Sequence, residues 1–446
     1  MSTPNEEAGT VTRPITEAGS ASQPIVEADR AVPLVHVSIA SKVGSLLDPI
    51  GKEGAARMLM RLMRRSGAGR SAEQADELVD RIGGHLGAEV TRSTAGFHGG
   101  VIARSQAAFL DFTFESLCQP RFAPGEFEQL RQESLAECTE RLDDDRARAR
   151  HFWLRKLFSG HPYGRPSGGT PESLRRVELS DLEELRERLF TRQHMRFAFA
   201  GAVDEPMARE AAARFHEALP VGREVAVDPA DPVTPNGRTL VFVDKPERTQ
   251  TQIVIGCLGT HAHDEDHTAL HVGNTVFGGT FTSRLMQEVR AKRGWSYGTS
   301  SAVPFDRRRQ AFSMWAFPQA SDAAPCLELE LQLLERWVKD GITARELAAA
   351  KKYLTRSHAF AVDTAQKRAA LRLDESIYAL PPGYQGSYLE RVAAVTLEQV
   401  NEAIRRRITP EHLVITVLGT HAEIGARIEA AIPRLASAET VRFDAD

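Results

Sequence analysis

The densest group of side chains able to bind a metal lies in HAHDEDHTALH, residues 261–271, which holds four histidines and three acidic residues. A helix would place His267 and His271, four residues apart, on one face, as in helical zinc sites. Asp264 to Asp266 have a simpler interpretation, because carboxylates are favoured in the first turn of a helix. We therefore expect an ordinary helix start, and whether the segment binds any metal stays open from the sequence.

Nucleophilic and redox chemistry lack a recognisable arrangement. The sequence has no GxSxG elbow, and no cysteine has a histidine nearby in a known pattern. The cysteines are Cys118, Cys138, Cys257 and Cys326. They are widely spaced without a CxxC motif, so we expect small buried hydrophobic side chains. An active hydrolase that uses other residues would need a nucleophile that the sequence does not offer.

Arg290 and Tyr297 are a cation and a phenol seven residues apart. Such a pair could donate hydrogen bonds to an oxygen on which negative charge develops. Spacing alone favours a plainer interpretation. Arg290 lies near the end of a helix stopped by Gly294, where the helix dipole favours positive charge. Tyr297 follows in a predicted strand and would be core.

Composition and charge are those of a soluble globular protein. Hydrophobic residues make up 42% and charged residues 26% of the 446 residues, so the core needs no disulfide or metal to support it. A net charge of −4 favours neither a nucleic acid nor an anionic membrane as partner. No stretch approaches the roughly 18 apolar residues of a membrane span.

Residues 1–30 are polar and acidic, and we expect a flexible tail there. They show neither the basic nor the apolar region of a secretory signal. The expected location is the cytoplasm, and a periplasmic location would require a different start or a removed leader.

The chain contains an internal repeat. Residues 174–201 resemble residues 389–419: each copy reads as an amphipathic helix, a short loop and an apolar strand that ends in glycine. A repeat offset by about half the chain length predicts two tandem homologous domains, each a sheet flanked by helices. The strands do not alternate regularly with single helices, so the predicted class is α+β.

The Pro-, Asp- and Gly-rich stretch around residues 229–237 is the predicted linker between domains 31–228 and 238–446. Residues 32–40 read as a buried strand and residues 51–66 as an amphipathic helix.

Residues 51–93 resemble the pitrilysin/insulinase-type (M16-like) zinc metalloprotease family. In that family the first helix carries His-x-x-Glu-His, in which the histidines bind zinc and the glutamate is the general base. The same positions here hold Arg57, Met60 and Arg61. The family's third zinc ligand, a glutamate on a later helix, matches Glu137.

The resemblance continues through HPYGRPSGGTPESL (161–174) and GGTFTSRLMQEVRAKRGWSYGTS (278–300). The second stretch is similar to a signature in which an arginine and a tyrosine bind substrate and transition state, and it places them at Arg290 and Tyr297. The branch that it resembles has two-domain, processing-peptidase-like subunits. The fold implied is half of a clam-shaped dimer.

The altered motif implies a metal-free site, because guanidinium groups cannot ligate zinc and would repel it. Arg57 and Arg61 would project from one helical face, and a guanidinium matches a carboxylate in two hydrogen bonds. We therefore hypothesise that both arginines hold Glu137, which otherwise reads as a solvated helix residue.

The resemblance implies a zinc-less, non-catalytic subunit of a heterodimeric zinc endopeptidase, inactive alone and without a cofactor of its own. Its partner would be a homologous zinc-bearing subunit, and its substrate a peptide or unfolded polypeptide. GGTFT is shorter than the glycine-rich loop of mitochondrial non-catalytic subunits, so presequence recognition is not implied. The alternatives are a purely structural member, like core subunits of a respiratory complex, and a homodimeric peptide-binding shell.

Overall fold

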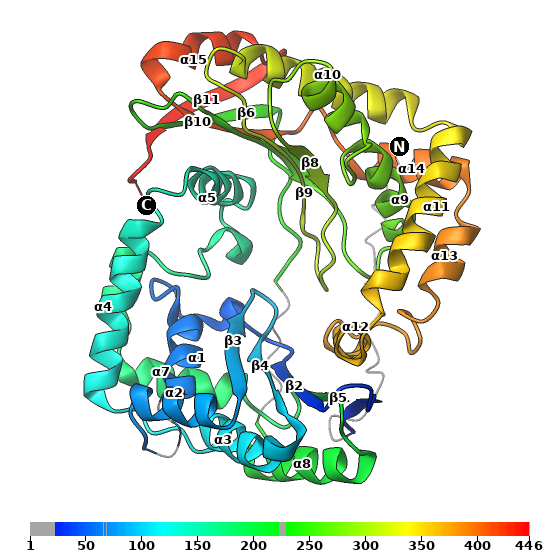
Figure 1. Ribbon diagram of the computed structural model, residues 1–446. Coiled ribbons are helices and arrows are strands. Elements are labelled where there is room, and N and C mark those ends of the chain that lie inside the picture. Colours follow the sequence, from blue (N-terminus) through cyan, green and yellow to red (C-terminus); the bar gives the residue numbers. More distant parts are fainter. Residues whose placement is uncertain (1–22, 66, 68, 223–228, 446) are drawn as a thin grey trace, which may run out of the picture.

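The computed structural model describes residues 23–65, 67, 69–222 and 229–445, which form two lobes that each contain one β-sheet (Figure 1). The first sheet has five strands in the order β1-β5-β2-β4-β3, and the second has six in the order β11-β6-β10-β7-β9-β8. Helices cover both sheets, so each lobe is a sheet flanked by helices.

The elements of the N-terminal half are β1 (Ile25–Ala28), β2 (Leu34–Ser41), η1 (Ser45–Leu47), α1 (Ala55–Arg65), α2 (Ala72–Arg81), β3 (Gly84–Val90), β4 (Ala95–Ile102), η2 (Ala103–Ser105), α3 (Gln106–Cys118), α4 (Pro124–Glu140), α5 (Asp145–Leu157), η3 (Pro162–Gly164), α6 (Pro171–Arg176), α7 (Leu179–Leu189), β5 (Met195–Gly201) and α8 (Glu205–Ala218). Those of the C-terminal half are β6 (Arg238–Asp244), β7 (Gln252–Leu258), α9 (His267–Phe277), η4 (Met286–Ala291), β8 (Thr299–Ala302), β9 (Ala311–Ala316), α10 (Ala323–Asp340), α11 (Ala344–Ala361), α12 (Ala365–Ile377), α13 (Tyr388–Ala394), α14 (Leu397–Arg407), β10 (Val414–Gly419), α15 (His421–Ala430) and β11 (Leu435–Arg442).

The two sheets share one topology. In each half the first five strands are arranged 1-5-2-4-3, with the first pair parallel and the next three antiparallel. The repeated segments 174–201 and 389–419 form matching elements, namely α6, α7 and β5 in one half and α13, α14 and β10 in the other. The predicted α+β class with two homologous mixed domains is confirmed.

The prediction of a flexible tail over residues 1–30 is wrong for Ile25–Ala28, which form the strand β1. Ile25–Ala28 pairs in parallel with the end of β5, just as β6 pairs with β10 in the other half. Four residues are too few for a periodic pattern to identify a strand. Residues 1–22 of the expected tail lie outside the described residues, and residues 229–237 carry no helix or strand.

The helix predicted over residues 51–66 is α1 (Ala55–Arg65). Its apolar residues at helical spacing lie in the core, and each is 0% exposed: Ala55, Ala56, Leu59, Leu62 and Met63. The strand predicted over residues 32–40 is β2, in which alternate side chains are buried.

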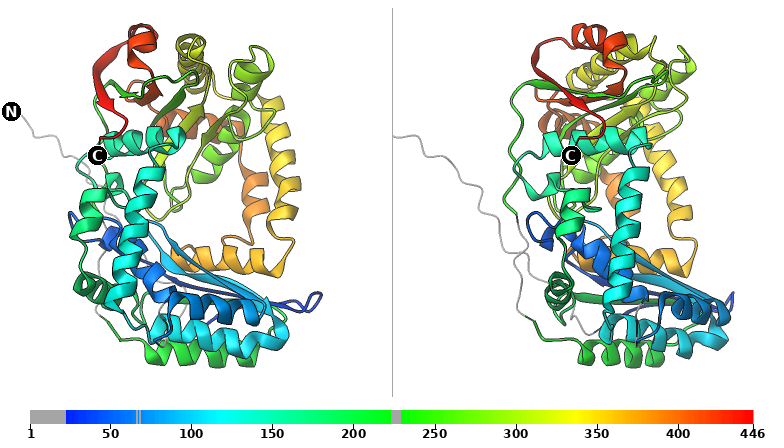
Figure 2. Two further views of the ribbon diagram at one scale, coloured as in Figure 1. Left: turned by 60° about the vertical axis from the view of Figure 1, so that its left-hand side comes forward. Right: turned by 90° about the vertical axis from the view of Figure 1, so that its left-hand side faces the viewer.

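Each half contributes one helix to the sheet of the other half (Figure 1, Figure 2). Helix α5 packs on β10, β7 and β6, where Trp153 is buried and its indole Nε1 donates to the Val414 carbonyl at 3.0 Å. Helix α12 packs in the same way on β5, β1 and β2, with Leu373 beside Ala198 and Ala200. The exchanged helices tie the halves together, and α5 follows directly on α4.

None of the helices in the described ranges is both long and apolar enough to cross a lipid bilayer.

Glu330 of α10 is a carboxyl group buried inside the C-terminal half, with 0% exposure. Its Oε1 accepts a hydrogen bond from Thr299 Oγ1 at 3.1 Å, and its Oε2 has no partner. Burial raises the pKa of Glu330 to about 8, and the Thr299 hydroxyl offsets only part of this effect. The carboxyl group is therefore protonated in the folded protein at neutral pH.

A folded-state pKa of about 8, above the ordinary 4.5, means that the folded chain binds the proton more tightly than the unfolded chain. Stability should fall as pH rises between those values, by up to about 1.4 kcal/mol per pH unit. Replacing the group by a neutral amide in Glu330→Gln should remove this loss. The measurement is the melting temperature from pH 6 to 8.5. Parallel curves for both proteins would contradict the assignment.

Candidate functional site

Helix α1 presents a row of three arginines to helix α4. Arg57, Arg61 and Arg65 follow one another at four-residue spacing, so they share one face of α1, while its opposite face packs in the core. The N-terminus of α1 is held by Asp48, whose carboxylate accepts from the amides of Gly54 and Ala56, each at 2.8 Å. The row of guanidinium groups is therefore fixed by a buried, capped helix.

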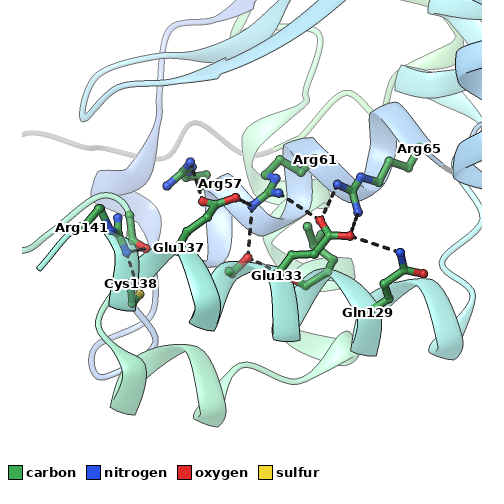
Figure 3. A network of polar contacts seen from close by, with 11 residues as sticks. Arg57, Arg61, Arg65, Gln129, Glu133, Glu137, Cys138 and Arg141 are labelled. Carbon is green, nitrogen blue, oxygen red and sulfur yellow. Dashed lines mark hydrogen bonds and ion pairs between the residues drawn. The ribbon is translucent and has the colours of Figure 1, made fainter. Parts of the chain in front are cut away.

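Two glutamates of α4, Glu133 and Glu137, face this row (Figure 3). Glu137 Oε2 lies 2.9 Å from Arg57 Nη2, and Glu137 Oε1 lies 2.9 Å from Arg61 Nη1. Glu133 accepts two hydrogen bonds from Arg65, at 3.0 and 2.6 Å, and lies 3.2 Å from Arg61 Nη2. Arg61 thus bridges both carboxylates, and its Nη1 also donates to Ser134 Oγ.

The network is partly shielded from solvent. The hydrogen bond that Arg65 donates to Glu133 lowers the pKa of Glu133 and raises the pKa of Arg65. Burial lowers the pKa of Arg61, although Glu137 opposes this effect. The two glutamate side chains are 31% and 34% exposed, so each pair contributes about 1 kcal/mol or less by itself. The geometry holds α1 against α4 through five charges.

The ion pairs of Arg57 and Arg61 with Glu137, hypothesised from the sequence, are present. Sequence reasoning missed Arg65 and Glu133. The signal was available, since Glu133 precedes Glu137 by four residues and Arg65 follows Arg61 by four, so both helices repeat their charges at one spacing. Met60, at the position of the family's general base, is 1% exposed and packs in the core instead.

The side chains present at this position do not fit a zinc ion. Guanidinium groups donate hydrogen bonds and offer no lone pair to a metal. The lone carboxylate at the family's third ligand position, Glu137, already accepts from two arginines. A cation added here would have to displace Arg57 and Arg61 and overcome their repulsion.

Arg290 and Tyr297 lie together on the surface of the C-terminal half. The guanidinium carbon of Arg290, in η4, is 4.7 Å from the centre of the Tyr297 ring and 5.9 Å from that of Phe281. Tyr297 is 78% exposed and Phe281 80% exposed. The plainer interpretation of Tyr297 as core is therefore wrong, whereas Gly294 does end the helical segment, with φ at 67°.

Arg290 differs from the basic residues beside it. Arg284 pairs with Glu346, and both Lys292 and Arg293 pair with Glu288. The guanidinium of Arg290 has no hydrogen bond or ion pair to any described residue, and the same is true of the Tyr297 hydroxyl. A cation and a phenol stacked together with free polar ends can bind an oxygen ligand.

The histidine segment 261–271 forms an ordinary helix start. His263 Nε2 bonds the Tyr378 carbonyl at 2.7 Å, and His267 Nε2 bonds the Pro304 carbonyl at 3.1 Å. Burial lowers the pKa of His267 to about 4, so this ring is neutral at physiological pH. The acidic residues of the segment pair with two arginines of α14. Arg407 pairs with Asp264 and Asp266. Arg406 pairs with Glu265 and Asp266. Within the described ranges no three histidine, cysteine or acidic side chains converge as a metal site.

Comparison with known families agrees with this architecture. Residues 25–170 match the family described as insulinase (peptidase family M16), and residues 176–354 match the peptidase M16 inactive domain. The chain belongs to the M16 family. The resemblance inferred from the sequence is thereby confirmed, and the altered residues of α1 lie inside the first matched region.

Similar sequences come from several bacteria. An uncharacterised zinc protease of Mycobacterium leprae is 28% identical over 394 residues, covering 88% of both chains. A non-peptidase homolog of Helicobacter pylori is 22% identical over 309 residues, covering 68% of this chain and 70% of its own. The M16 relatives thus carry both kinds of name.

Solved structures agree on the fold. The M16 inactive domain protein of Pseudomonas fluorescens superposes with a TM-score of 0.84 at 22% identity, covering 91% of this chain and 98% of its own. A protease of Helicobacter pylori gives 0.78 at 18% identity, with 90% and 99% covered.

If α1 and α4 mark the position of a lost metal site, restoring the ligands should restore binding. The variant combining Arg57→His, Met60→Glu and Arg61→His frees Glu137 and supplies two imidazoles. We expect about one zinc per chain by elemental analysis after dialysis, and none in the unaltered chain. Adding Glu137→Ala should weaken binding by 10-fold or more. A folded triple variant without zinc would contradict the assignment.

Proposed function

We propose that this chain is the zinc-less, non-catalytic subunit of a heterodimeric zinc endopeptidase. In this proposal it contributes Arg290 and Tyr297 to the active site of a homologous, zinc-bearing partner. The substrate is a peptide or an unfolded polypeptide segment. Alone, the chain is inactive and needs no cofactor.

The observation that carries the proposal is the contrast between the two halves. The N-terminal half has its polar face neutralised internally by ion pairs of Arg57 and Arg61 with Glu137. The C-terminal half leaves Arg290 without a carboxylate partner, next to an exposed Tyr297. A purely structural member would gain nothing from an unpaired cation stacked on an exposed phenol.

The chemistry follows from the groups that remain. Attack on a peptide carbonyl concentrates negative charge on its oxygen, and a guanidinium and a phenol hydroxyl are donors that stabilise such charge. Arg290 is held in place by stacking on Tyr297 rather than by an acid, so its donors stay available. Zinc in the partner would supply the Lewis acid and the site for the attacking water.

The comparisons with known proteins support a non-catalytic role. The second region matches a domain described as inactive, and one relative is named a non-peptidase homolog. Other relatives are named zinc proteases, which fits a family in which zinc-bearing and zinc-less chains coexist.

The test is peptide hydrolysis by this chain, by an M16 chain of the same organism that carries an intact zinc motif, and by their mixture. We expect the mixture to hydrolyse the peptide faster than either chain does alone. Arg290→Ala and Tyr297→Phe should each lower kcat about 10²-fold, as loss of one oxyanion donor does.

Two matched variants serve as controls. Arg293→Ala removes an arginine of the same segment that is already paired with Glu288, and Tyr353→Phe removes a hydroxyl from another exposed tyrosine. Both should keep kcat within a factor of two or three. If the mixture is active and neither Arg290→Ala nor Tyr297→Phe changes kcat, this chain acts only as a scaffold. Zinc-dependent activity of this chain alone would refute the proposal.

A further inference from the structure

A second group of arginines lines a cavity beside the Arg57–Glu137 pair. The cavity, of about 310 Å³, lies where the C-terminal end of α4, the first turns of α5 and the loop 166–171 meet. Its wall includes Cys138 of α4 and Arg141, which directly follows the end of α4 (Figure 3). The cavity therefore adjoins the network that replaces the metal site.

The charged lining of this cavity is almost entirely basic. Its ionisable side chains, apart from the thiol of Cys138, are Arg92, Arg141, Arg148, Arg150, His151 and Asp444. The one carboxylate among them, Asp444, accepts two hydrogen bonds from Arg442, at 2.9 and 2.6 Å. Asp444 also interacts electrostatically with Arg148, and no other acid of the lining is left to neutralise Arg92 or Arg150.

The arginines differ in what they already bind. Arg148 donates to the carbonyls of Phe443 and Ala445, so it holds the C-terminal segment in place. Arg92 and Arg150 make no hydrogen bond or ion pair through their guanidinium groups with any described residue. The Nε of Arg92 is buried without an acceptor, and the guanidinium carbon of Arg92 lies over the Tyr163 ring, 5.9 Å from its centre.

Electrostatic repulsion between these neighbouring arginines is unfavourable for the folded protein. Burial lowers the pKa of Arg92, and the charge of Arg150 lowers it further, whereas Tyr163 and Asp306 act in the opposite direction. Burial and the charge of Arg146 lower the pKa of Arg150. Guanidinium groups nevertheless stay protonated, so the repulsion persists until an anion enters. Although neighbouring groups shield part of the Arg150 guanidinium from water, the residue as a whole is exposed, so an anion can reach it.

The wall is shaped to keep space in front of the guanidinium groups. A Cβ at Gly168 would clash with the guanidinium of Arg141 and crowd that of Arg57. Apolar side chains also line the cavity, namely Leu142, Ala147, Leu154, Pro166 and Pro171, together with the hydroxyl-bearing Thr139, Ser167 and Thr170. A cavity of this kind suits a charged group attached to a short stretch of less polar chain.

We propose that this cavity binds a carboxylate of a peptide, from an acidic side chain or the C-terminus, with Arg92 and Arg150 as its donors. The planar two-oxygen group matches the fork of a guanidinium. The proposal rests on the proposed function, since it makes acidic peptides the substrate class that this subunit presents to its partner.

The test is peptide binding to the full chain alone, by fluorescence anisotropy at low and high salt. One labelled probe alternates glutamate with alanine and keeps a free C-terminus. The second has glutamine in place of glutamate, and the third is the second with an amidated C-terminus. We expect the third to bind at least 10-fold more weakly than the first, and Arg150→Gln and Arg92→Gln to weaken the first at least 10-fold each.

The matched control is Arg155→Gln, which removes the same charge from α5 outside this cavity and should change affinity less than threefold. Because the guanidinium groups of Arg92 and Arg150 make no hydrogen bond or ion pair with a described residue, their variants should keep the melting temperature, whereas a structural role would lower it. Equal binding of all three peptides, an equal effect of Arg155→Gln, or binding of inorganic phosphate alone would overturn the proposal.

This experiment is independent of the partner. Arg290→Ala should bind the acidic peptide normally, since Arg290 does not line the cavity. Failure of peptide binding would therefore leave the contribution of Arg290 to the partner's active site standing, and failure of that contribution would leave the cavity assignment standing.

Discussion

The ion pairs that join α1 to α4 decide what chemistry the N-terminal half of the chain can perform. Three arginines on one face of α1 meet two glutamates on α4, and Arg61 contacts both carboxylates. In M16 proteases a divalent cation holds the corresponding helices through histidine and glutamate ligands. Here guanidinium groups supply the positive charge, so the helices keep their packing while the position loses all Lewis acidity.

This substitution has a structural and a chemical consequence. Because α1 is buried on its opposite face and capped by Asp48, the arginines are fixed where they are. The same fold that positions a metal in relatives therefore positions a closed polar network here. Any chemistry of this chain must therefore come from elsewhere on the molecule. Arg290 and Tyr297 lie together on the other half, with Tyr297 exposed and neither polar end bonded to a described residue.

Much of the architecture could be predicted because it rests on local periodicity and on the repeat. The buried face of α1, the strand β2 and the matching segments α7–β5 and α14–β10 all follow from patterns within about 30 residues. The strand β1 could not be predicted, since its four residues form a strand only by pairing with the distant β5. The sequence also contained no sign that α5 and α12 each pack on the sheet of the other half.

The candidate site shows the same division. Arg57, Arg61 and Glu137 were found because the family places their positions, and the contact between them spans 80 residues for Arg57. Arg65 and Glu133 were missed although their spacing was regular. The exposure of Tyr297 and the grouping of Arg92 with Arg150 depend on tertiary packing, which no pattern within one segment encodes.

The most direct measurement of the central claim is the composition of the complex that this chain forms in its own cell. The chain, tagged at its C-terminus, would be purified under native conditions, and its partners, mass and zinc content determined. We expect one copy of a second M16 chain with an intact zinc motif, and one zinc per pair of chains. Copies of this chain alone, or two zinc ions per pair, would contradict it.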